Sequence, residues 1–390
     1  MDALTTPSNW QRVRLGDILE LLTDYHANGS YEILKNNVTL LKNVDFAIMI
    51  RTTNFENNDF KNDLIYIDKK AYEFLSKSKV FAGDILVNKI ANAGTAYFMP
   101  KLNQPVSLGM NLFLLRIKPS YNNLFIFKQI ANYERVLKTF ANGSATKTIT
   151  KNVIKNLLIP LPPLNEQIAI ANILSGVDRY LYSLRALILK KESVKKALSF
   201  ELLSQRKRLK GFNQAWQRVR LGDICEITTG SLDANEMVHY GKYRFYTCAK
   251  EYYFIDKYAF DTEAILISGN GAYVGYVHYY KGKFNAYQRT YVLDNFSEHI
   301  IFVKYFLTMF LQSHIQTNKN EGNTPYIVMA TLKDFEILLP PLNEQIAIAN
   351  ILSALDHEII SLKNKKRQFD NIKKALNHDL MSAKIRVLKK

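Results

Sequence analysis

The feature that most constrains this sequence is that two long stretches of it occur twice. The stretch Trp10–Ile18, which reads WQRVRLGDI, recurs unchanged as Trp216–Ile224. A second stretch, Pro162–Ser175, recurs unchanged as Pro340–Ser353. Chance identity over such lengths is negligible, so the chain contains an internal duplication, and any fold assigned to it must repeat as well.

The repeated stretches are spaced differently in the two copies. The first stretch recurs from position 10 to position 216, whereas the second recurs from position 162 to position 340. The second offset is the smaller one, so the interval between the stretches is shorter in the second copy. Between the stretches the two copies share almost no sequence. We call the repeated stretches frames and the unlike sequences between them variable segments. Frames and variable segments alternate along the chain, which favours one scaffold that presents two different recognition modules.

The second repeated stretch is predicted to begin a long helix. The proline pairs at 162–163 and 340–341 cannot lie inside a helix, but they suit the positions just before one. Asn165 then serves as a cap or first-turn residue, and Glu166 is favourable beside the positive end of a helix. Apolar residues follow every seven positions over about four to five heptads, which is typical of a coiled coil. Each helix would span on the order of 60 Å over about 40 residues.

The heptads predict that the two helices pack against each other. The predicted packing residues are Ile170, Val177, Leu184, Leu198, Ile348, Leu355, Leu362, Phe369 and Leu376. Offset positions that would widen the stripe are Ile173, Leu174, Leu181, Leu187, Ile188, Val194, Leu202, Ile351, Leu352, Ile359, Ile372 and Leu380. Duplicated frames related by a pseudo-two-fold axis would pair the helices antiparallel. The alternative is that each helix docks separately onto its own domain.

Polar residues on these helices fall into two predicted groups. Three interrupt the apolar stripe and would help to fix the register: Lys191, Lys365 and Lys366. The others are expected on the outer faces, solvated or facing a protein partner: Lys190, Lys195, Lys196, Arg206, Lys207, Arg208, Lys210, Lys363, Lys373 and Lys374.

Charge and cysteine usage narrow the choice of partner and compartment. Lysine and arginine number 52 against 35 acidic residues, a formal charge of +17. This excess makes nucleic acid the first partner to consider, with a generic basic surface or a ribosome-associated protein as the alternative. Cys225 and Cys248 fit a reducing compartment and lack the spacing of a zinc site. We therefore expect no bound metal. No stretch resembles a membrane span or a secretory signal, so we expect a cytoplasmic protein.

Both variable segments are expected to be α+β. Short apolar runs such as Asp84–Val87 and Ala264–Ile267 are typical of strands, whereas Leu124–Phe140 and His299–His314 have helical spacing. Their loops combine basic, amide, hydroxyl and aromatic side chains, the types that bind phosphates and base edges.

These loop residues are the candidates for contact with DNA. In the first segment they are Lys42, Arg51, Thr53, Asn54, Asn88, Lys89, Asn92, Ser144, Thr146 and Lys147. In the second segment they are Arg244, Tyr246, Thr247, Ser268, Asn270, Tyr273, Lys283, Asn285, Gln288 and Arg289. The loop Ser268–Tyr273 also contains two glycines, which let backbone amides approach a phosphate or base closely. For any single residue a solvated turn is the alternative, so only the clustering is informative.

Patterns for catalysis are weak. Gly269, Gly271 and Gly275 are not spaced as in a dinucleotide-binding loop, and no Gly-Lys-Ser/Thr follows them. Residues 323–326, Asn-Thr-Pro-Tyr, resemble the Asn-Pro-Pro-Tyr motif of adenine methyltransferases, but Thr324 replaces the first proline. We therefore expect no catalytic residues in this chain. The alternatives are a complete methyltransferase or nuclease with an unrecognised site, and a scaffold protein whose charge is incidental.

The repeated frame Leu-Pro-Pro-Leu-Asn-Glu-Gln-Ile-Ala-Ile-Ala-Asn-Ile-Leu, which opens a helix after each variable segment, resembles the specificity subunits of Type I restriction-modification enzymes. The openings at Trp10 and Trp216 carry the same resemblance, and the stretch from Phe254 to Tyr291 looks like one target-recognition domain of that family. The resemblance covers essentially the whole chain.

The resemblance implies an α+β protein with pseudo-two-fold duplication. Two target-recognition domains, residues 1–161 and 211–339, would be connected by two long antiparallel helices within residues 162–210 and 340–390. Each domain would read one half of a bipartite, asymmetric target in double-stranded DNA, and the helix pair would set the gap between the halves. The chain would be non-catalytic and bind no cofactor. Two modification (adenine methyltransferase) subunits would bind around the helices and use S-adenosylmethionine, and restriction subunits would join the full complex.

Overall fold

A computed structural model describes residues 9–141, 148–318 and 325–387. The chain divides into two compact units, each of which we describe by itself. The first contains Met1–Tyr182 and Arg367–Lys390, and the second contains Ser183–Lys366. The division passes through both long helices, so each unit contains the start of one long helix and the end of the other.

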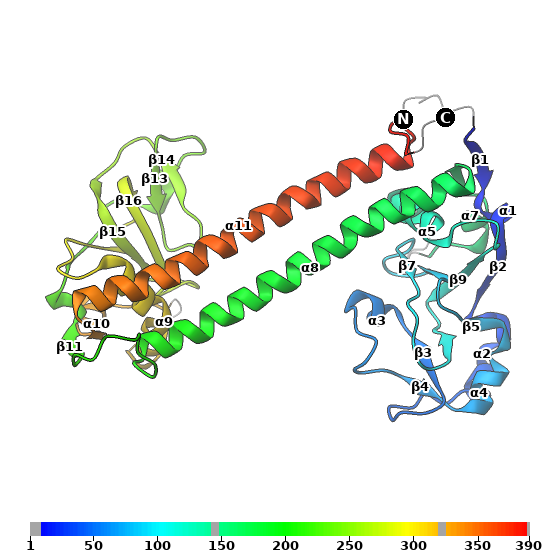
Figure 1. Ribbon diagram of the computed structural model, residues 1–390, viewed down its shortest axis with the longest axis horizontal. Helices are drawn as coiled ribbons and strands as arrows, with labels where there is room; N and C mark the ends of the chain where they lie inside the picture. Colours follow the sequence, from blue (N-terminus) through cyan, green and yellow to red (C-terminus); the bar gives the residue numbers. More distant parts are fainter. Residues whose placement is uncertain (1–8, 142–147, 319–324, 388–390) are drawn as a thin grey trace. The chain divides into compact units, whose positions relative to one another are not determined.

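The two long helices are α8 (Leu164–Leu203) and α11 (Leu342–Met381) (Figure 1). Both begin just after the proline pairs and have the same length of 40 residues, as an exact duplication of the frame requires. The predicted domain boundaries near 161, 210 and 339 separate frames from variable segments rather than compact units, and they stay a prediction.

In the first unit the helices pack antiparallel. Asp178 on α8 accepts a hydrogen bond from Lys373 on α11, with the two atoms 2.6 Å apart. The ring centroids of Tyr180 and Phe369 lie 4.6 Å apart. The predicted pairing of the helices with each other is therefore confirmed here.

Within the second unit, too, the helices contact each other. Lys191 lies 2.8 Å from Glu358, and Lys363 lies 2.6 Å from Glu192. From Lys191 to Lys195, one turn forward along α8, the partner on α11 moves back from Glu358 to Asp356, so the two helices run in opposite directions. Lys191 interrupts the apolar stripe as predicted, and its ion pair favours a single register.

Three lysines of the long helices form ion pairs that the sequence did not predict. Lys195, Lys363 and Lys373 were expected on the outer faces. This was wrong for the half-buried Lys195 and Lys373, whereas Lys363 is exposed as expected although it also forms an ion pair. Lys195 pairs with Asp356, and the other two pair with carboxylates on the opposite helix. The long aliphatic stem of lysine lets it reach across the helix pair while it covers apolar surface.

The predicted packing residues are most deeply buried near the helix starts. Ile170 and Ile348 lie in the cores of the first and second unit, respectively. Leu376 packs against the core that contains Ile170, and Leu198 against the core that contains Ile348. The helices therefore both pair with each other and dock onto the domains, so the two alternatives are both part of the fold. The remaining predicted packing residues are buried or half-buried: Val177, Leu184, Leu355, Leu362 and Phe369.

The offset positions fall into two groups. Buried or half-buried, as predicted, are Leu174, Leu181, Ile188, Leu202, Ile351, Leu352, Ile359 and Leu380. Ile173, Leu187, Val194 and Ile372 are each exposed to solvent, so their predicted burial was wrong. A contact between only two helices buries a narrow seam, and residues beside that seam stay outside unless a third element covers them.

Gly176 in the interior of α8 is expected to be a weak point in the first unit. No atom lies within 4 Å of a Cβ built at this position, and the second copy of the frame has Ala354 at the equivalent place. We expect Gly176→Ala to raise the free energy of unfolding by about 0.5–1 kcal/mol, since alanine restricts the unfolded chain more than glycine does. Denaturant unfolding measures this, with Ala354→Gly as the matched reverse change. A loss of stability in Gly176→Ala would contradict the expectation.

The repeated stretches meet in each unit as a two-stranded ribbon. β1 (Gln11–Arg14) pairs antiparallel with β10 (Leu158–Leu161), and β11 (Gln217–Arg220) pairs with β18 (Glu336–Leu339). The registers are equivalent, because Gln11 faces Leu161 and Gln217 faces Leu339. This contact explains why both stretches are repeated although they are far apart in the sequence.

A buried carboxylate joins each ribbon to the long helices. In the second unit Glu344 accepts hydrogen bonds from Trp216 Nε1 at 3.2 Å and from Arg208 at 3.2 and 2.5 Å. In the first unit Glu166 accepts them from Trp10 at 3.3 Å and from Arg386 at 2.8 and 3.2 Å. We call each Trp–Glu–Arg set a clasp.

The clasps correct a prediction and reveal a missed repeat. Arg208 was expected on an outer face, but it is half-buried against Glu344. Arg208 and Arg386 are related by the same offset as Pro162 and Pro340. The duplication therefore extends beyond the helix ends, where a pair of serines, Ser204 and Ser382, and the two arginines are the identical residues.

The variable segment of the first unit forms two sheets. One contains β2 (Leu19–Asp24), β9 (Leu112–Ile117), β6 (Ile85–Asn88) and β7 (Ala96–Phe98), in that order. The other contains β4 (Tyr66–Ile67), β3 (Ala47–Ile50), β8 (Val106–Leu108) and β5 (Lys79–Val80). Helices α1 (Leu15–Ile18), α2 (Tyr31–Asn37), α3 (Thr52–Glu56), α4 (Lys69–Phe74), α5 (Asn123–Asn132), α6 (Glu134–Thr139) and α7 (Lys151–Lys155) complete this unit.

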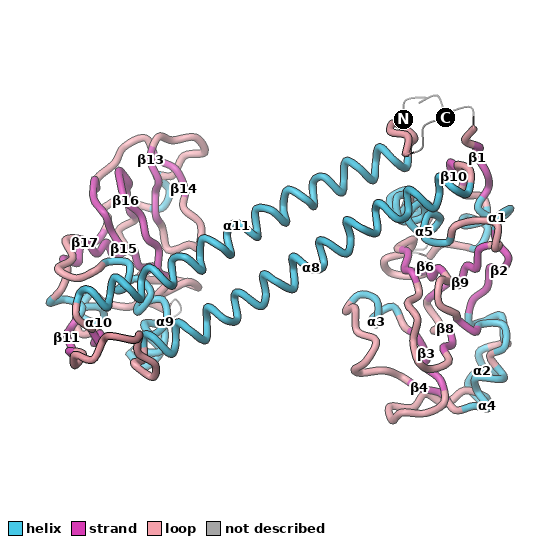
Figure 2. The backbone as a smooth tube through the Cα atoms, in the orientation of Figure 1, coloured by secondary structure: helices cyan, strands magenta, loops and turns pink. Residues whose placement is uncertain are grey.

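The variable segment of the second unit forms one six-stranded sheet (Figure 2). Its order is β12 (Glu226–Thr229), β17 (Thr290–Asp294), β15 (Phe260–Ser268), β16 (Val277–Ala286), β13 (Tyr243–Tyr246) and β14 (Tyr253–Ile255). Helices α9 (Ile300–Asn318) and α10 (Met329–Lys333) complete it.

No helix in the described part of the chain is both long and apolar enough to cross a membrane.

Although their sequences differ, the two variable segments share one topology. Ile85 on β6 faces Leu115 on β9 and Phe98 on β7. Ile265 on β15 faces Leu293 on β17 and Tyr279 on β16 in the same way. β3 pairs antiparallel with β4 and parallel with β8, as β13 pairs with β14 and β16. The single strand β16 thus corresponds to β7 and β8, which residues 99–105 separate in the first unit.

Candidate nucleic-acid interface

In the second unit, four loop segments converge at the end of β15. The amide of Gly269 donates to the carbonyl of Arg289 at 2.8 Å, and the amide of Ile327 donates to the carbonyl of Gly269 at 2.9 Å. Cys248 Sγ donates to the same Arg289 carbonyl at 3.2 Å. The segments after β13 and β15, before β17 and before α10 are therefore held together at one place.

Gly269 makes this convergence possible. A Cβ at position 269 would lie 2.3 Å from the carbonyl oxygen of Arg289, a distance that real Cβ atoms do not show. Gly271 has a φ of +79°, which side chains disfavour, and its amide donates to the carbonyl of Pro325 at 2.9 Å. The glycines predicted to allow close backbone approach thus bring backbone segments against each other.

The first unit has the same convergence at the end of β6. The amide of Lys89 donates to the carbonyl of Asn111 at 2.9 Å, and the amide of Ile149 donates to the carbonyl of Lys89 at 3.1 Å. A bridge between Ile90 and Thr148 matches the bridge between Asn270 and Tyr326 in the second unit. The backbone positions correspond, so Asn111 in the first unit is the counterpart of Arg289 in the second.

Side chains suited to nucleic acid extend from the convergence in the second unit. Gln288 and Arg289 are exposed at the turn before β17. The ammonium group of Lys250 lies 5.1 Å from the ring centroid of Tyr273, which is also exposed. Arginine and glutamine can each make paired hydrogen bonds to a base edge, and a cation over an aromatic ring adds positive charge near phosphate.

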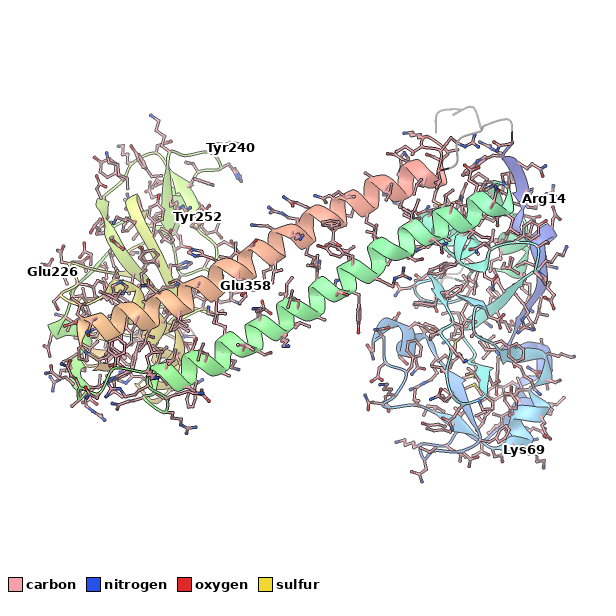
Figure 3. The ribbon with its side chains drawn as sticks, viewed as in Figure 1. Arg14, Lys69, Glu226, Tyr240, Tyr252 and Glu358 are labelled. Atoms are coloured by element: carbon pink, nitrogen blue, oxygen red, sulfur yellow. The ribbon has the colours of Figure 1, made fainter. Side chains whose placement is uncertain are left out.

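Further aromatic side chains lie on the β13–β14 side of this sheet. Arg244 is held between the rings of Tyr252 and Tyr280, at 4.3 and 4.4 Å from their centroids, and donates to Tyr246 at 3.3 Å. Tyr240 and Tyr252 are exposed on this side (Figure 3). Burial raises the pKa of Tyr246, so its hydroxyl stays protonated as an acceptor for Arg244.

Six predicted DNA-binding residues are buried. They are Asn54, Asn88, Tyr246, Thr247, Ser268 and Asn285. Asn88 accepts from Thr52 and donates to Tyr97, and Asn285 donates to the carbonyl of Lys257. A buried amide whose donors are used inside the fold presents no edge to a base, which argues against base contacts by Asn88 and Asn285. For the other four residues a role in binding DNA stays a prediction.

Lys89 is held by a carboxylate rather than directed to solvent. Its ammonium lies 3.2 Å from Asp24, which also pairs with Lys151 at 3.0 Å. Burial would raise the pKa of Asp24, but the hydrogen bonds from the two lysines outweigh burial and lower the pKa below its ordinary value. The ion pair of Lys89 with Asp24 therefore fixes the loop that follows β6, and the lysine adds little positive charge to the exposed surface of that loop.

The other predicted residues lie in several places. Exposed or half-buried are Lys42, Arg51, Thr53, Asn92, Arg244, Asn270, Tyr273, Lys283, Gln288 and Arg289. Arg51 Nη2 donates to the carbonyl of Asp63 at 3.0 Å, and Lys283 lies 4.6 Å from the ring of Tyr258. Ser144, Thr146 and Lys147 lie outside the described residues. Their role in binding DNA stays a prediction.

Sequence reasoning missed two residues at the convergence, Asn111 and Lys250. Asn111 lies on an exposed turn before β9, where neighbouring residues are apolar or small. Only its equivalence to Arg289 singles it out. His278 was also missed as a positioning residue. Its Nε2 lies 2.9 Å from the carbonyl of Ala249, and burial lowers its pKa, so the neutral ring holds the 248–250 segment against β16.

Comparison with known proteins gives consistent matches. The sequence model of the family described as Type I restriction modification DNA specificity domain matches residues 7–192 and 213–369. Over 424 aligned residues the chain is 29% identical to a putative type I restriction enzyme MjaX specificity subunit of Methanocaldococcus jannaschii, with 97% of each chain covered. It is 38% identical over 170 residues to the type I restriction enzyme EcoDI specificity subunit of Escherichia coli, a match that spans 37% of that subunit and 43% of this chain.

The fold is also similar to solved structures. The S subunit of a Type I restriction-modification system from M. genitalium superimposes with a TM-score of 0.66 at 18% identity, with 97% of each chain covered. At this identity the likeness concerns the fold alone. It agrees with the predicted fold class of two α/β domains joined by long helices.

Proposed function

Because the chain belongs to the family of Type I restriction-modification DNA specificity subunits, we propose that it reads a bipartite, asymmetric DNA target on behalf of partner enzymes and performs no catalysis itself. Each unit reads one half of the target with its loop convergence. The long helices set the gap between the halves and dock two modification subunits.

One observation carries the proposal: the same loop convergence occurs in both units with different side chains. Arg289 in the second unit corresponds to Asn111 in the first, and Gly269 corresponds to Lys89. Arginine is suited to the edge of guanine and asparagine to that of adenine, so equivalent positions would select different bases. A shared frame with unlike side chains is what reading two unlike half-sites requires.

The helix pair is suited to act as a ruler. α8 and α11 are each 40 residues long, so each extends over about 60 Å. Half-sites one helical turn apart are separated by roughly 34 Å, which lies within this reach. The formal charge of +17 would provide the phosphate contacts that make such binding fall with salt.

Exposed apolar residues at equivalent positions support two docked copies of one partner. In the first unit they are Leu164, Ile168, Tyr182 and Ile372, and their counterparts in the second are Leu342, Ile346, Ile360 and Val194. Every pair is related by the offset of the second repeated stretch, and every member is at least 39% exposed. Apolar groups kept in solvent at duplicated positions favour a protein partner that binds each unit once.

We assign the chemistry to these partners. The modification subunits would bind S-adenosylmethionine and transfer the methyl group to adenine, and restriction subunits would join the full complex. This chain is proposed to bind no cofactor of its own. Methyl transfer by the purified chain alone would contradict that assignment.

The test is to map methylated adenines in DNA from cells that contain the chain and its modification subunit. The expected result is one motif with two unlike specific halves and a fixed gap of unspecified bases. A continuous motif, or two identical halves, would refute the proposal.

Variants at the two equivalent positions make the assignment specific. We expect Arg289→Ala to cost about 1–3 kcal/mol in discrimination at one base of one half-site, and Asn111→Ala to relax one base of the other half. The measurement is the methylated motif of each variant. If Arg289→Ala weakened methylation of all sequences equally, Arg289 would contact phosphate rather than a base.

A further inference from the structure

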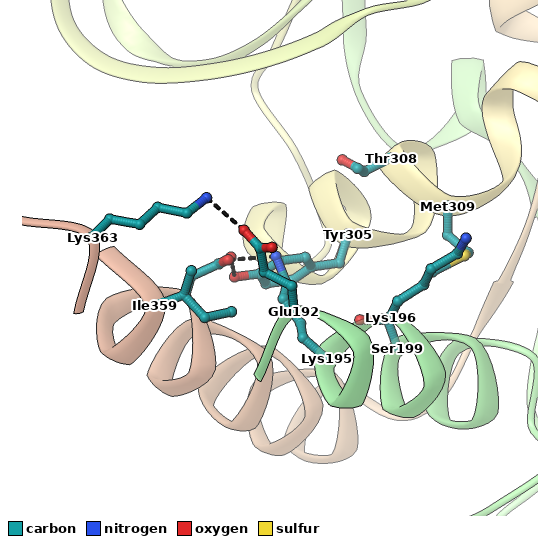
Figure 4. Close-up of a pocket in the computed structure, with 10 residues that line it drawn as sticks. Glu192, Lys195, Lys196, Ser199, Tyr305, Thr308, Met309, Ile359 and Lys363 are labelled. Atoms are coloured by element: carbon teal, nitrogen blue, oxygen red, sulfur yellow. Dashed lines mark hydrogen bonds and ion pairs between the residues drawn. The ribbon is translucent and has the colours of Figure 1, made fainter. Parts of the chain in front are cut away.

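A carboxylate on α11 joins three elements of the second unit. Asp356 accepts a hydrogen bond at 2.6 Å from the hydroxyl of Tyr305, which lies on α9 of the recognition domain. Its other oxygen accepts from Lys195 on α8. The Tyr305 oxygen also lies 3.3 Å from the hydroxyl of Ser353, one turn earlier on α11. Lys195, Tyr305 and Asp356 line a cavity of about 340 Å³ between α8, α9 and α11 (Figure 4).

The first unit contains an equivalent junction on α8. Asp178 accepts from Lys128 on α5 at 2.7 Å and from Lys373 on α11 at 2.6 Å. Asp178 and Asp356 occupy equivalent positions of the second repeated frame, and so do Lys195 and Lys373. Lys128 and Tyr305 differ in chemistry, but each lies on the recognition-domain helix that packs against the start of a long helix.

The two oxygens of each aspartate thus have separate tasks. Oδ2 is bonded to the recognition domain and Oδ1 to the opposite long helix. Burial would raise the pKa of both aspartates, but the hydrogen bonds from the neighbouring side chains outweigh burial and lower it. The carboxylates are therefore ionised near neutral pH. Hydrogen bonds to an ionised carboxylate are shorter and stronger than those between neutral groups, so they fix the positions of their partners more firmly.

We propose that Asp178 and Asp356, with Lys128 and Tyr305, are positioning residues that restrain rotation of each recognition domain about the helix pair and so set how strictly the gap in the target is read. This inference rests on the proposed function. It assigns the strictness of spacing to two junctions, in addition to the length of the helices.

The geometry of DNA explains why rotation matters. Adding one base pair to the gap moves a half-site by about 3.4 Å and turns it by roughly 35° around the duplex axis. A domain that can rock about its helices could follow this turn, whereas a domain tied at three elements cannot. Loosening the junction should therefore admit gaps that the native chain rejects, without changing the bases that are read.

The experiment uses the chain assembled with its modification subunit. Methylation rates are measured on duplexes that carry both half-sites with gaps from two base pairs shorter to two longer than the native gap. Tyr305→Phe and Lys128→Met each remove only the contact from the recognition domain. Lys191→Met is the matched control, because it breaks a contact between the long helices that involves no recognition domain.

We expect Tyr305→Phe and Lys128→Met to raise kcat/KM on gaps one base pair from native by about tenfold relative to the native gap, the effect of losing one hydrogen bond to a charged group. Lys128→Arg should keep the narrow profile because it keeps the ion pair, and Lys191→Met should match the wild type. An unchanged profile in both variants, or an equal loss on every gap, would overturn the proposal. Wild-type methylation that ignores the gap would instead refute the proposed function itself.

Discussion

Arg208→Met is expected to lower the free energy of unfolding of the second unit by roughly 3–5 kcal/mol, the typical cost of removing one partner from a buried ion pair. Glu344 has no exposed side-chain surface, and two of its three hydrogen bonds come from Arg208. Methionine would fill much of the arginine volume but would leave a buried carboxylate with only Trp216 as a donor.

Urea unfolding followed by circular dichroism measures the effect. Lys210→Met is the matched control, because it removes one positive charge from an exposed position two residues away. Arg386→Met makes the same change in the clasp of the first unit. We expect its cost to be smaller, because Arg386 is 32% exposed against 23% for Arg208, so water can replace it more readily. Equal stabilities of Arg208→Met and Lys210→Met would show that the clasp contributes nothing.

Inserting three heptads into each long helix is expected to lengthen the gap in the methylated target by about nine to ten base pairs. The insertions belong between Tyr182 and Ser183 and between Lys366 and Arg367, where both helices pass from one unit to the other, so that no contact within a unit is disturbed. Twenty-one residues add about 31.5 Å, close to the roughly 34–36 Å of one turn of DNA. The half-sites would then face nearly the same direction as before.

One heptad in each helix is the informative comparison. It adds about 10.5 Å, or about three base pairs, but the half-sites would be turned by roughly a third of a turn. We expect methylation by this variant to fall by about 100-fold on every gap, the order of loss that follows misplacement of reacting groups. Mapping methylated adenines measures both variants. An unchanged gap after three heptads would mean that the helices do not set the spacing.

An insertion in α8 alone provides the remaining control. The antiparallel register joins Asp178 to Lys373 in one unit and Lys191 to Glu358 in the other. Residues added to one helix only cannot preserve both pairs without a bulge in the longer helix. We therefore expect the single insertion to destabilise the chain rather than to shift the gap.

The interior of the recognition domains could not be predicted from loop composition. Asn88, Ser268 and Asn285 are residue types that suit base edges, yet they lie at strand ends with their side chains inside. Because successive residues of a strand point to opposite faces, a shift of one position decides between a solvent-facing amide and a buried one. Nothing in the local sequence settles that register.

The duplication and the two long helices could be predicted from the amino-acid sequence, because proline positions and heptad periodicity act through neighbours a few residues apart. Antiparallel pairing of the helices was the favoured interpretation of the duplication, with separate docking as its alternative. The folded chain was needed to show that two dissimilar segments share one strand order and that Glu166 binds Arg386, 220 residues away. The same holds for the junctions at Asp178 and Asp356. Such contacts depend on which surfaces the folded chain brings together. Because they are made by single polar residues far apart in the sequence, no periodic pattern in the sequence predicts them.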